Sequence, residues 1–309
     1  MNNAGEIVAI HNFEQLEAAA KQQTPKRIVV AGADNAAAID AVARAENQGI
    51  TRPILIGASG KMQAHLDTLS PESAAAAIYV DDSDESIART AVELIRSGEG
   101  DILLKGSIPT SALLKAVLDR ERGIRSASLL SDSFLFEDTS RDGNQLIDIT
   151  DGGVVLYPDV DQKQAILENA VQVYHALGHE LPKVAICAAI ETVNDKMPPT
   201  QDAAELKHRY ESGAITGCIV DGPLALDGAL SSESLKIKGI DSPLGGKADV
   251  LVMPTIEAAN LVAKSTQYVA GKEAAHVIVG ATVPVLIPSR SDTPRGKYLS
   301  IALAAVMST

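Results

Sequence analysis

The chain has 309 residues, a length that favours two domains, because single domains commonly hold about 100–200 residues. Hydrophobic residues make up 46% and charged residues 22%, which excludes a disordered chain. The net charge of −13 disfavours nucleic acid or an anionic membrane as a partner, since both require a positive surface. With aromatic residues at only 3%, the core is expected to consist of Ala, Val, Ile and Leu.

The sequence gives no indication of export or membrane insertion. Its N-terminal stretch lacks a basic segment followed by an apolar one, and no apolar run approaches about 18 residues. Cys187 and Cys218 each stand in an apolar run, so we interpret them as buried thiols of strands rather than as a disulfide or zinc ligands. We therefore expect a soluble, cytoplasmic protein.

Short apolar runs alternate with longer helical patterns along the chain. Strands are predicted at 28–30, 54–56, 78–80, 102–104, 184–186, 218–220, 250–252, 277–279 and 285–287. Helices are predicted at 35–48, 85–96, 162–177, 201–211 and 256–266, with a last helix before residue 307, and glycines at 49, 98, 178 and 213 stand where helix C-caps fall. Because the strands are apolar throughout, they are expected to be parallel and covered on both faces. The fold class is thus α/β with mainly parallel sheets.

One stretch departs from this alternation. Residues 126–158 are predicted to form consecutive short strands joined by turns at 142–144 and 151–153. No helix intervenes, so we place the domain change near residues 130–140. The final strand and helix, 285–307, follow the second domain without a linker, and the residues alone leave open which domain they join.

Ligands in open α/β sheets bind beyond the carboxyl ends of the strands, so the residues that follow each predicted strand are the candidates for a site. The strongest group is Ser289, Arg290 and Asp292, where a strand opens into a helix. A helix N-terminus beside a guanidinium favours an anion, although a helix cap with an Arg290–Asp292 ion pair explains the same residues. Lys105 follows another strand, as a cation facing a ligand or as a solvated lysine.

Asn260 and Lys264 are four residues apart in a predicted helix and so share a face, toward a ligand or toward solvent. His175 and His179 have the same spacing but lack the Glu of a metalloprotease motif, and the acidic stretch 138–161 matches no EF-hand loop. We therefore expect no metal site. The sequence also contains no dinucleotide fingerprint, P-loop or nucleophile elbow.

Several of these strand ends together resemble one family, the phosphate acetyltransferases and phosphate butyryltransferases. The segments 221–227 (DGPLALD), 247–254 (KADVLVMP) and 280–290, with its Gly-Ala, Pro-Val and Ser-Arg pairs, are similar to family motifs. Upstream, Lys105-Gly106 with Thr110 resembles a turn typical of the butyryl branch, and 188–198 resembles a further family stretch. The resemblance covers residues 25–309.

The resemblance implies two α/β domains separated by a cleft, in the architecture of isocitrate and isopropylmalate dehydrogenases. It places the C-terminal strand and helix with the first domain, so the domains are predicted as 1–135 plus 285–309 and 136–284. It also implies a homodimer or higher homo-oligomer. The implied reaction is the reversible transfer of an acyl group between CoA and inorganic phosphate, with acyl-CoA, phosphate and acyl phosphate as ligands and no cofactor.

The resemblance also implies roles for individual residues. Arg290 would bind phosphate and stabilise the charge of the transition state, and Ser289 would donate a hydrogen bond to the oxyanion or the thiolate. Asp292 is the nearest carboxylate and the candidate general base, because Gly296 stands about where acetyl-transferring members have an Asp. The predicted substrate-binding residues are Lys105, Gly106, Thr110, Lys115, Asp221, Asn260 and Lys264.

Two departures from the family pattern concern the shape of the pocket. Ala259-Asn260 replaces the usual Gly-Asn, and Ala263-Lys264 replaces the usual Tyr-Lys. The Lys-Gly turn and the Ser-Arg-x-Asp ending favour a butyryl or branched acyl group over acetyl. Two alternatives are a regulatory module that binds acyl-CoA without turnover, and a decarboxylating dehydrogenase of similar fold that uses a metal and NAD.

Overall fold

The computed structural model describes residues 9–80, 83–140, 144–289 and 291–308, and the chain divides into two compact units. One unit contains residues 14–128 and 274–308, and the other contains residues 9–13 and 129–273. We call them the unit of the chain ends and the middle unit. The predicted boundary at residue 135 lies near the unit boundary at Leu129.

The units differ from the predicted domains in two places. Residues 274–284, predicted for the second domain, belong to the unit of the chain ends because their strand pairs with the last strand of the chain. Residues 9–13, predicted for the first domain, belong to the middle unit. The reason is local pairing: the amide of Ile10 donates to Leu177 O over 2.8 Å, and the amide of Leu146 donates to His11 O over 2.8 Å.

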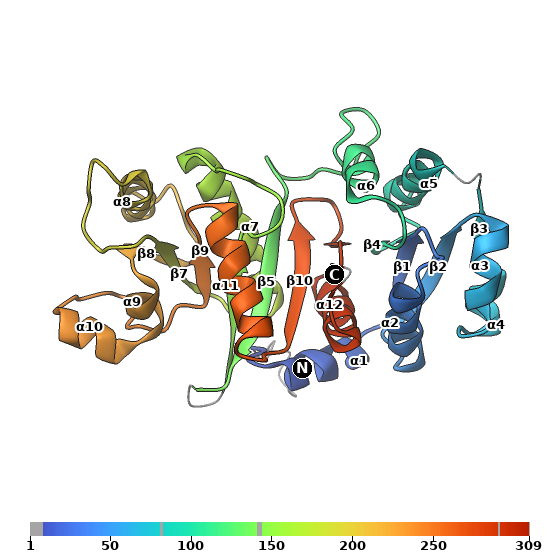
Figure 1. Ribbon diagram of the computed structural model, residues 1–309, viewed down its shortest axis with the longest axis horizontal. Helices are drawn as coiled ribbons and strands as arrows, with labels where there is room; N and C mark the ends of the chain where they lie inside the picture. Colours follow the sequence, from blue (N-terminus) through green and yellow to red (C-terminus); the bar gives the residue numbers. More distant parts are fainter. Residues whose placement is uncertain (1–8, 81–82, 141–143, 290, 309) are drawn as a thin grey trace. The chain divides into compact units, whose positions relative to one another are not determined.

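The unit of the chain ends is built on a six-stranded sheet of order β3-β2-β1-β4-β11-β10, in which only the β10–β11 pair is antiparallel among the described residues. Helices α2 and α12 cover one face, and α5 and α6 cover the other (Figure 1). Its elements are α1 (Phe13–Gln22), β1 (Lys26–Ala31), α2 (Ala36–Asn47), β2 (Thr51–Gly57), α3 (Ser59–Leu66), α4 (Pro71–Ala75), β3 (Ile78–Tyr79), α5 (Asp84–Arg96), β4 (Ile102–Lys105), α6 (Thr110–Val117), β10 (Ala274–Val279), β11 (Val285–Leu286) and α12 (Pro294–Met307).

The middle unit is built on a five-stranded sheet of order β5-β6-β9-β7-β8, parallel except for the β5–β6 hairpin. Helices α7 and α8 pack on one face around a core of aliphatic side chains, and α11 packs against β6 on the other. Its elements are β5 (Ser131–Asp138), β6 (Gln145–Thr150), α7 (Val160–Ala176), β7 (Lys183–Cys187), α8 (Pro198–Glu211), β8 (Ile219–Leu224), α9 (Leu226–Leu230), α10 (Ser232–Lys238), β9 (Val250–Val252) and α11 (Ile256–Tyr268).

The predicted α/β class with mainly parallel sheets is confirmed, and every predicted strand is present. The glycines proposed as helix C-caps, Gly49, Gly98, Gly178 and Gly213, all have a positive φ between 72° and 84°. Glycine is favoured there because a Cβ atom is strained in the left-handed conformation. The shorter helices, among them α3 and α6, have no counterpart among the predicted elements.

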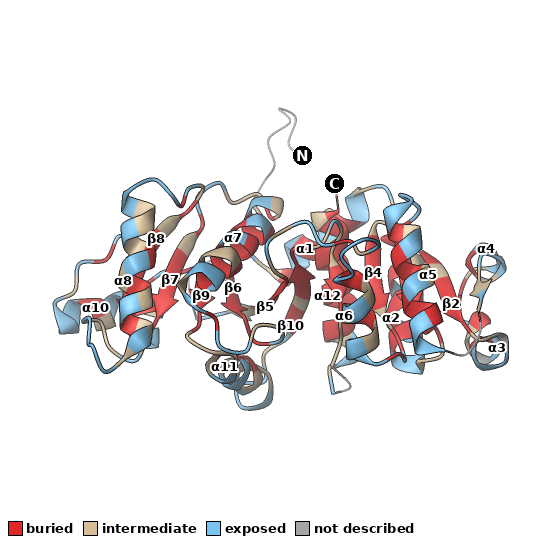
Figure 2. Ribbon diagram, turned by 90° about the horizontal axis from the view of Figure 1, so that it is seen from above, coloured by how far each residue is buried: buried red, intermediate tan, exposed pale blue. Residues whose placement is uncertain are grey.

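Helix α12 is the centre of its unit, and Figure 2 shows it buried along nearly its whole length. Every residue from Gly296 to Val306 is buried, which fits a sequence of Ala, Leu, Ile and Val with little amphipathic patterning. The apolar helix has only 14 residues. No helix in the described part of the chain has the length and apolarity needed to cross a membrane.

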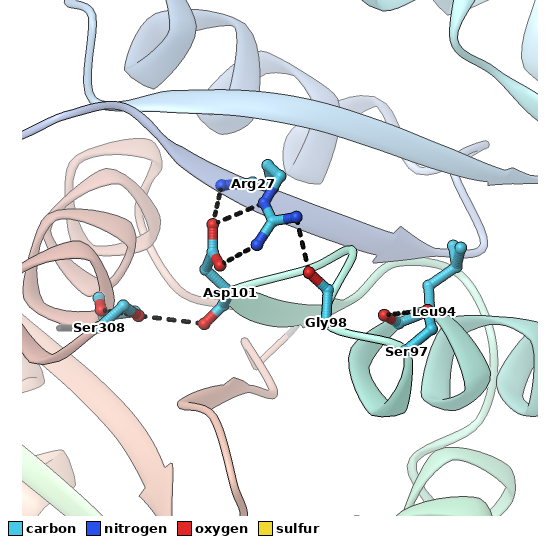
Figure 3. Close-up of polar contacts among 7 residues, drawn as sticks. Arg27, Leu94, Ser97, Gly98, Asp101 and Ser308 are labelled. Carbon is cyan, nitrogen blue, oxygen red and sulfur yellow. Dashed lines mark hydrogen bonds and ion pairs between the residues drawn. The ribbon is translucent and has the colours of Figure 1, made fainter.

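A polar clamp closes the amino-terminal edge of this sheet (Figure 3). Arg27 of β1 donates to Asp101 through its amide over 2.7 Å, Nε over 3.0 Å and Nη2 over 2.6 Å, and Nη1 donates to Gly98 O over 2.7 Å. Ser308, just after α12, donates to Asp101 O over 3.0 Å. The guanidinium lowers the pKa of Asp101, so the clamp stays ionised at neutral pH. It fixes β4 between β1 and the end of α12.

Candidate active site

The carboxyl ends of three neighbouring strands form one edge of the sheet in the unit of the chain ends. Strand β4 pairs with β1 on one side and with β11 on the other, all parallel, so the residues that follow these strands lie next to one another. They are the segments 32–34, 105–108, 287–289 and 291–292. This edge is where ligands bind in open α/β sheets, and it contains predicted site residues from two separate parts of the sequence.

Gly106 is required for the loops after β1 and β4 to meet. A Cβ atom at this position would lie 1.9 Å from Gly32 O, far inside van der Waals contact. The amide of Ser107 donates to Gly32 O over 2.9 Å, and its hydroxyl donates to the Asp34 carboxylate. The structure thus gives Gly106 a structural role, the close approach of two loops, and its part in substrate binding stays a prediction.

Lys105 ends β4 and is half-buried. Its ammonium donates to Gly106 O over 3.1 Å and to Ile108 O over 3.2 Å. These contacts hold positive charge at the carboxyl edge instead of letting the side chain extend into solvent. Thr110 is the first residue of α6 and Lys115 lies in its last turn; both are exposed. They stand five residues apart and so point to different sides of the helix.

Ser289 and Asp292 close a turn between β11 and α12. The amide of Ser289 donates to Asp292 Oδ2 over 2.6 Å, and the amide of Asp292 donates to Ser289 O over 3.2 Å. The Ser289 hydroxyl lies 3.1 Å from that of Ser291. Thr293 then caps α12 by accepting from the amide of Gly296 over 3.0 Å. The turn places Ser289 beside the positive end of a helix dipole.

Two basic residues of the first turn of α12, Arg295 and Lys297, have partners at or near this turn. The Lys297 ammonium, although buried, donates to Asp292 O. Arg295 pairs with Glu17 of α1, and this contact, against the opposing effect of burial, lowers the pKa of Glu17. Arg290, predicted to bind phosphate, lies outside the described residues.

Asp221 of the middle unit is surrounded by partners from its own unit. Lys207 Nζ lies 2.7 Å from Asp221 Oδ1, the Ser242 hydroxyl donates to Oδ2 over 2.6 Å, and the amide of Gly222 donates to Oδ1 over 3.0 Å. The carboxylate in turn raises the pKa of Lys207. These contacts give Asp221 a structural role in fixing β8 to α8, and its predicted part in substrate binding stays a prediction.

Asn260 holds the loop that follows β6. Its amide nitrogen donates to Gly152 O over 3.1 Å from α11. In the same loop the Asp151 carboxylate accepts from the amides of Gly153, Val154 and Val155 over 2.8–3.0 Å. Burial, and next the charge of Asp132, raise the pKa of Asp151 to about 6.

Lys264, one turn further along α11, lies 5.8 Å from the centroid of the Tyr268 ring. The structure thus brings Lys105, Gly106, Ser289 and Asp292 to one edge of one unit, while Asp221, Asn260 and Lys264 belong to the other unit.

The cysteines play no part in these arrangements. Both are free and buried, as predicted, and burial raises the pKa of Cys187 to about 12 and that of Cys218 to about 11. Neither thiol is therefore ionised at neutral pH, and a thiolate nucleophile is ruled out at these positions. Among the residues with described positions, no three His, Cys, Asp or Glu side chains gather as a metal site.

The family model described as phosphate acetyl/butaryl transferase matches residues 80–305, which include the β4, β8, β9 and β11 strand ends. The chain belongs to this family. The sequence resemblance drawn from the strand-end motifs is thereby confirmed.

Relatives in the family carry both acetyl and butyryl names. A phosphate acetyltransferase of Thermotoga maritima is 41% identical over 281 residues, covering 91% of this chain and 95% of that protein. A probable phosphate butyryltransferase of Bacillus subtilis is 43% identical, covering 90% and 92%. The phosphate butyryltransferase of Clostridium acetobutylicum is 36% identical, covering 96% and 98%.

The solved structures agree with this membership. A branched-chain phosphotransacylase from Enterococcus faecalis V583 superposes with a TM-score of 0.81 at 30% identity, covering 92% of this chain and 99% of that one. A putative 4-hydroxythreonine-4-phosphate dehydrogenase from Salmonella typhimurium reaches a TM-score of 0.52 at 12% identity, which shows the shared fold alone. The predicted likeness to the dehydrogenase architecture is consistent with that second match.

The sequence motifs do not include one residue of the edge, His276. Its Nε2 lies 3.0 Å from Asp292 Oδ2, and it stands in the middle of β10. His276 belongs to no sequence motif, because it is a single histidine in a strand of apolar residues. The one feature that could have indicated a functional role is a polar side chain next to a predicted core strand. Only the pairing of β10 with β11 brings it beside the turn.

Proposed function

We propose that this chain catalyses the reversible transfer of a short acyl group between CoA and inorganic phosphate. The observation that carries the proposal is the position of Ser289, in the turn between β11 and α12 at the carboxyl edge of the sheet, within the matched family segment. Arg290 follows it directly in the sequence. A hydroxyl, a helix N-terminus and a guanidinium suit a phosphate that attacks a thioester.

In the proposed reaction a phosphate oxygen forms a bond to the thioester carbonyl carbon, and the carbon–sulfur bond then breaks. Negative charge collects first on the carbonyl oxygen and then on the departing CoA sulfur. Arg290 holds phosphate and stabilises this charge, and Ser289 donates its hydroxyl hydrogen to the oxyanion or the thiolate. Donors that are fixed before the reaction stabilise the transition state at little cost of reorganisation.

The reverse direction requires removal of the CoA thiol proton, and we propose Asp292 as the proton acceptor. It is the carboxylate next to Ser289, and its side chain is only 6% exposed. Lys105 contributes positive charge for anionic substrates from the neighbouring strand end, Lys115 contributes positive charge from α6, and Thr110 contributes a hydroxyl from the same helix. Asp221, Asn260 and Lys264 are the proposed substrate-binding residues of the middle unit.

Several finer properties belong to the same proposal. The Lys105-Gly106 turn and the Ser289-to-Asp292 ending favour butyryl or branched acyl groups over acetyl, and one methylene changes specificity by only ~10–200-fold. We propose that the reaction needs no metal or organic cofactor, that the protein acts in the cytoplasm, and that it forms a homodimer or higher homo-oligomer. The ligands are acyl-CoA, phosphate and acyl phosphate.

The test is release of CoA thiol from acetyl-, propionyl-, butyryl- and isobutyryl-CoA, with and without phosphate, in the presence of a chelator. Phosphate-dependent release is expected, fastest with a four-carbon acyl group. Because both cysteines of the protein are buried, the thiol reagent reports CoA with little background from the enzyme. Arg290→Ala serves as the inactive control.

Three other outcomes would replace the proposal. Binding of acyl-CoA without release of thiol from any ester would indicate a regulatory module. Reduction of NAD that depends on a divalent metal would indicate a decarboxylating dehydrogenase of the same fold. Release of thiol that does not depend on phosphate would indicate a thioesterase, and the assignment of the anion site would then be wrong.

A further inference from the structure

A chain of hydrogen bonds connects the core strand β10 to the backbone of Ser289. His276 Nε2 lies 3.0 Å from Asp292 Oδ2, and the same oxygen accepts from the amide of Ser289 over 2.6 Å. The side chain of Asp292 is 6% exposed and that of His276 is 17% exposed, so water competes weakly for both. Two donors from different segments therefore converge on one carboxylate oxygen.

The chemistry of the three groups fixes the direction of these bonds. An ionised carboxylate only accepts hydrogen bonds, so Nε2 of His276 carries the hydrogen that faces Asp292. This holds for the Nε2–H tautomer of the neutral ring and for the charged ring alike. The bond from His276 thus ties the carboxylate to β10, and the bond from Ser289 holds the Ser289 amide against the same oxygen.

His276 is itself rigidly placed. Its amide donates to the Ser300 hydroxyl over 3.0 Å, and that hydroxyl donates to Gly296 O over 2.9 Å, which joins β10 to the first turns of α12. The residue borders a small cavity whose other walls are mostly aliphatic and come from α2, β4, β11 and α12, among them Ala38, Leu104, Leu286 and Ile301. Asp292 thus contacts the ring, and Lys297 borders the same cavity.

Lys297 reinforces the same turn from the other side, since its ammonium donates to Asp292 O. Asp292 is thus held through its carboxylate by β10 and through its carbonyl by α12. A turn held at both points keeps the backbone of Ser289 in one place.

We propose that His276 is a positioning residue, which acts through Asp292 to fix Ser289 for acyl transfer. The inference rests on the proposed function, because it assigns Ser289 to the stabilisation of the transition state. It goes beyond that function by giving Asp292 a second partner and a second task. The Ser289 hydroxyl stabilises the charge of the transition state only if it is positioned to within a fraction of an ångström of the oxyanion. Loosening the turn should therefore lower the turnover rate rather than weaken substrate binding.

The expected effect is a fall of roughly 10- to 100-fold in kcat, the range for loss of a hydrogen bond to a charged group that orients a reacting one. The KM for acyl-CoA should stay within about threefold of the wild-type value. An interaction made only in the transition state has this signature, since kcat and kcat/KM then fall together.

The experiment compares His276→Gln with His276→Asn in the full-length protein, using butyryl-CoA and phosphate. The amide nitrogen of Gln reaches the position of the histidine Nε2, whereas that of Asn is too short to reach Asp292. The Gln variant should therefore keep most of kcat and the Asn variant should lose it, with thermal midpoints that match each other. His175→Ala is the control, because His175 Nε2 bonds Gly217 O over 2.8 Å in the middle unit and should leave kcat unchanged.

Three results would overturn the inference. One is an Asn variant with kcat within threefold of wild type. Another is a Gln variant as slow as the Asn variant while both keep the wild-type thermal midpoint. The third is a loss of kcat that follows the thermal midpoint instead of the donor. Absence of turnover in the wild type is a separate result: it would refute the proposed function, and the positioning role with it.

Discussion

Replacing Asp148 by Asn should stabilise the protein at pH 8 far more than at pH 5. Asp148 lies on β6 opposite Leu135 of β5, with 0% exposure. Neither carboxylate oxygen makes a hydrogen bond of normal geometry to a described residue, although Ser133 and the amide of Phe134 lie near enough to oppose the shift. Burial, and next the charge of Asp132, raise the pKa of Asp148 to about 8.

The sign and size of the effect follow from this shift. Between about pH 4 and pH 8 the unfolded chain has lost the Asp148 proton while the folded protein retains it, so stability falls as pH rises. Each unit of pH in this window costs about 1.4 kcal/mol, and the loss levels off above pH 8 at about 6 kcal/mol. From pH 5 to pH 8 the wild type should lose about 3–4 kcal/mol through this group. Asn does not ionise and should lose none of it.

The assay is urea unfolding of wild type and Asp148→Asn at pH 5, 6.5 and 8. It is followed by circular dichroism at 222 nm, because the chain has no Trp for fluorescence. The free-energy gap between the two proteins should widen steadily with pH. Asp40→Asn, at an exposed position of α2, is the control and should show no such widening. A gap that stays constant from pH 5 to pH 8 would refute the assignment of a protonated, buried Asp148.

Three further predictions concern the site and its surroundings. Arg290→Ala should reduce turnover by roughly 100-fold or more, because phosphate loses its bidentate partner. Arg290→Lys should recover part of this activity, because lysine supplies a point charge without the bidentate geometry. Near-normal kcat in the Ala variant would show that the anion site lies elsewhere. A Cys187→Ala, Cys218→Ala double variant should keep wild-type kcat, and thiol-modifying reagents at pH 8 should not inactivate the folded wild type, because burial keeps both thiols protonated. Gly106→Ala should lower both the thermal midpoint and kcat, because its Cβ would collide with Gly32 O; an unchanged midpoint would show that the two loops can separate freely.

Much of the architecture was readable from the sequence. Apolar runs predicted nine of the strands, and turn signals predicted the strands within residues 126–158. Glycines at the ends of helical patterns predicted C-caps that have a positive φ in the structure. These features are local, since the signal for a strand or a cap lies in residues close to it in the sequence. The same holds for the strand-end motifs, which predicted the family to which the chain belongs.

The tertiary structure alone decided which of these residues meet. Asp221 and Asp292 both follow from strand-end motifs, and the sequence does not distinguish their roles. In the structure Asp221 pairs with Lys207 and Ser242 and has a structural role. Asp292 instead connects His276 to Ser289. His276 and Asp148 belong to no motif.

Their environments arise from strand pairing and helix cover, which bring distant segments together. The period of the side chains and their apolar content determine that a strand forms. Long-range packing determines the neighbours of the strand, and with them the burial, the charges and the hydrogen bonds on which the chemistry of a side chain depends.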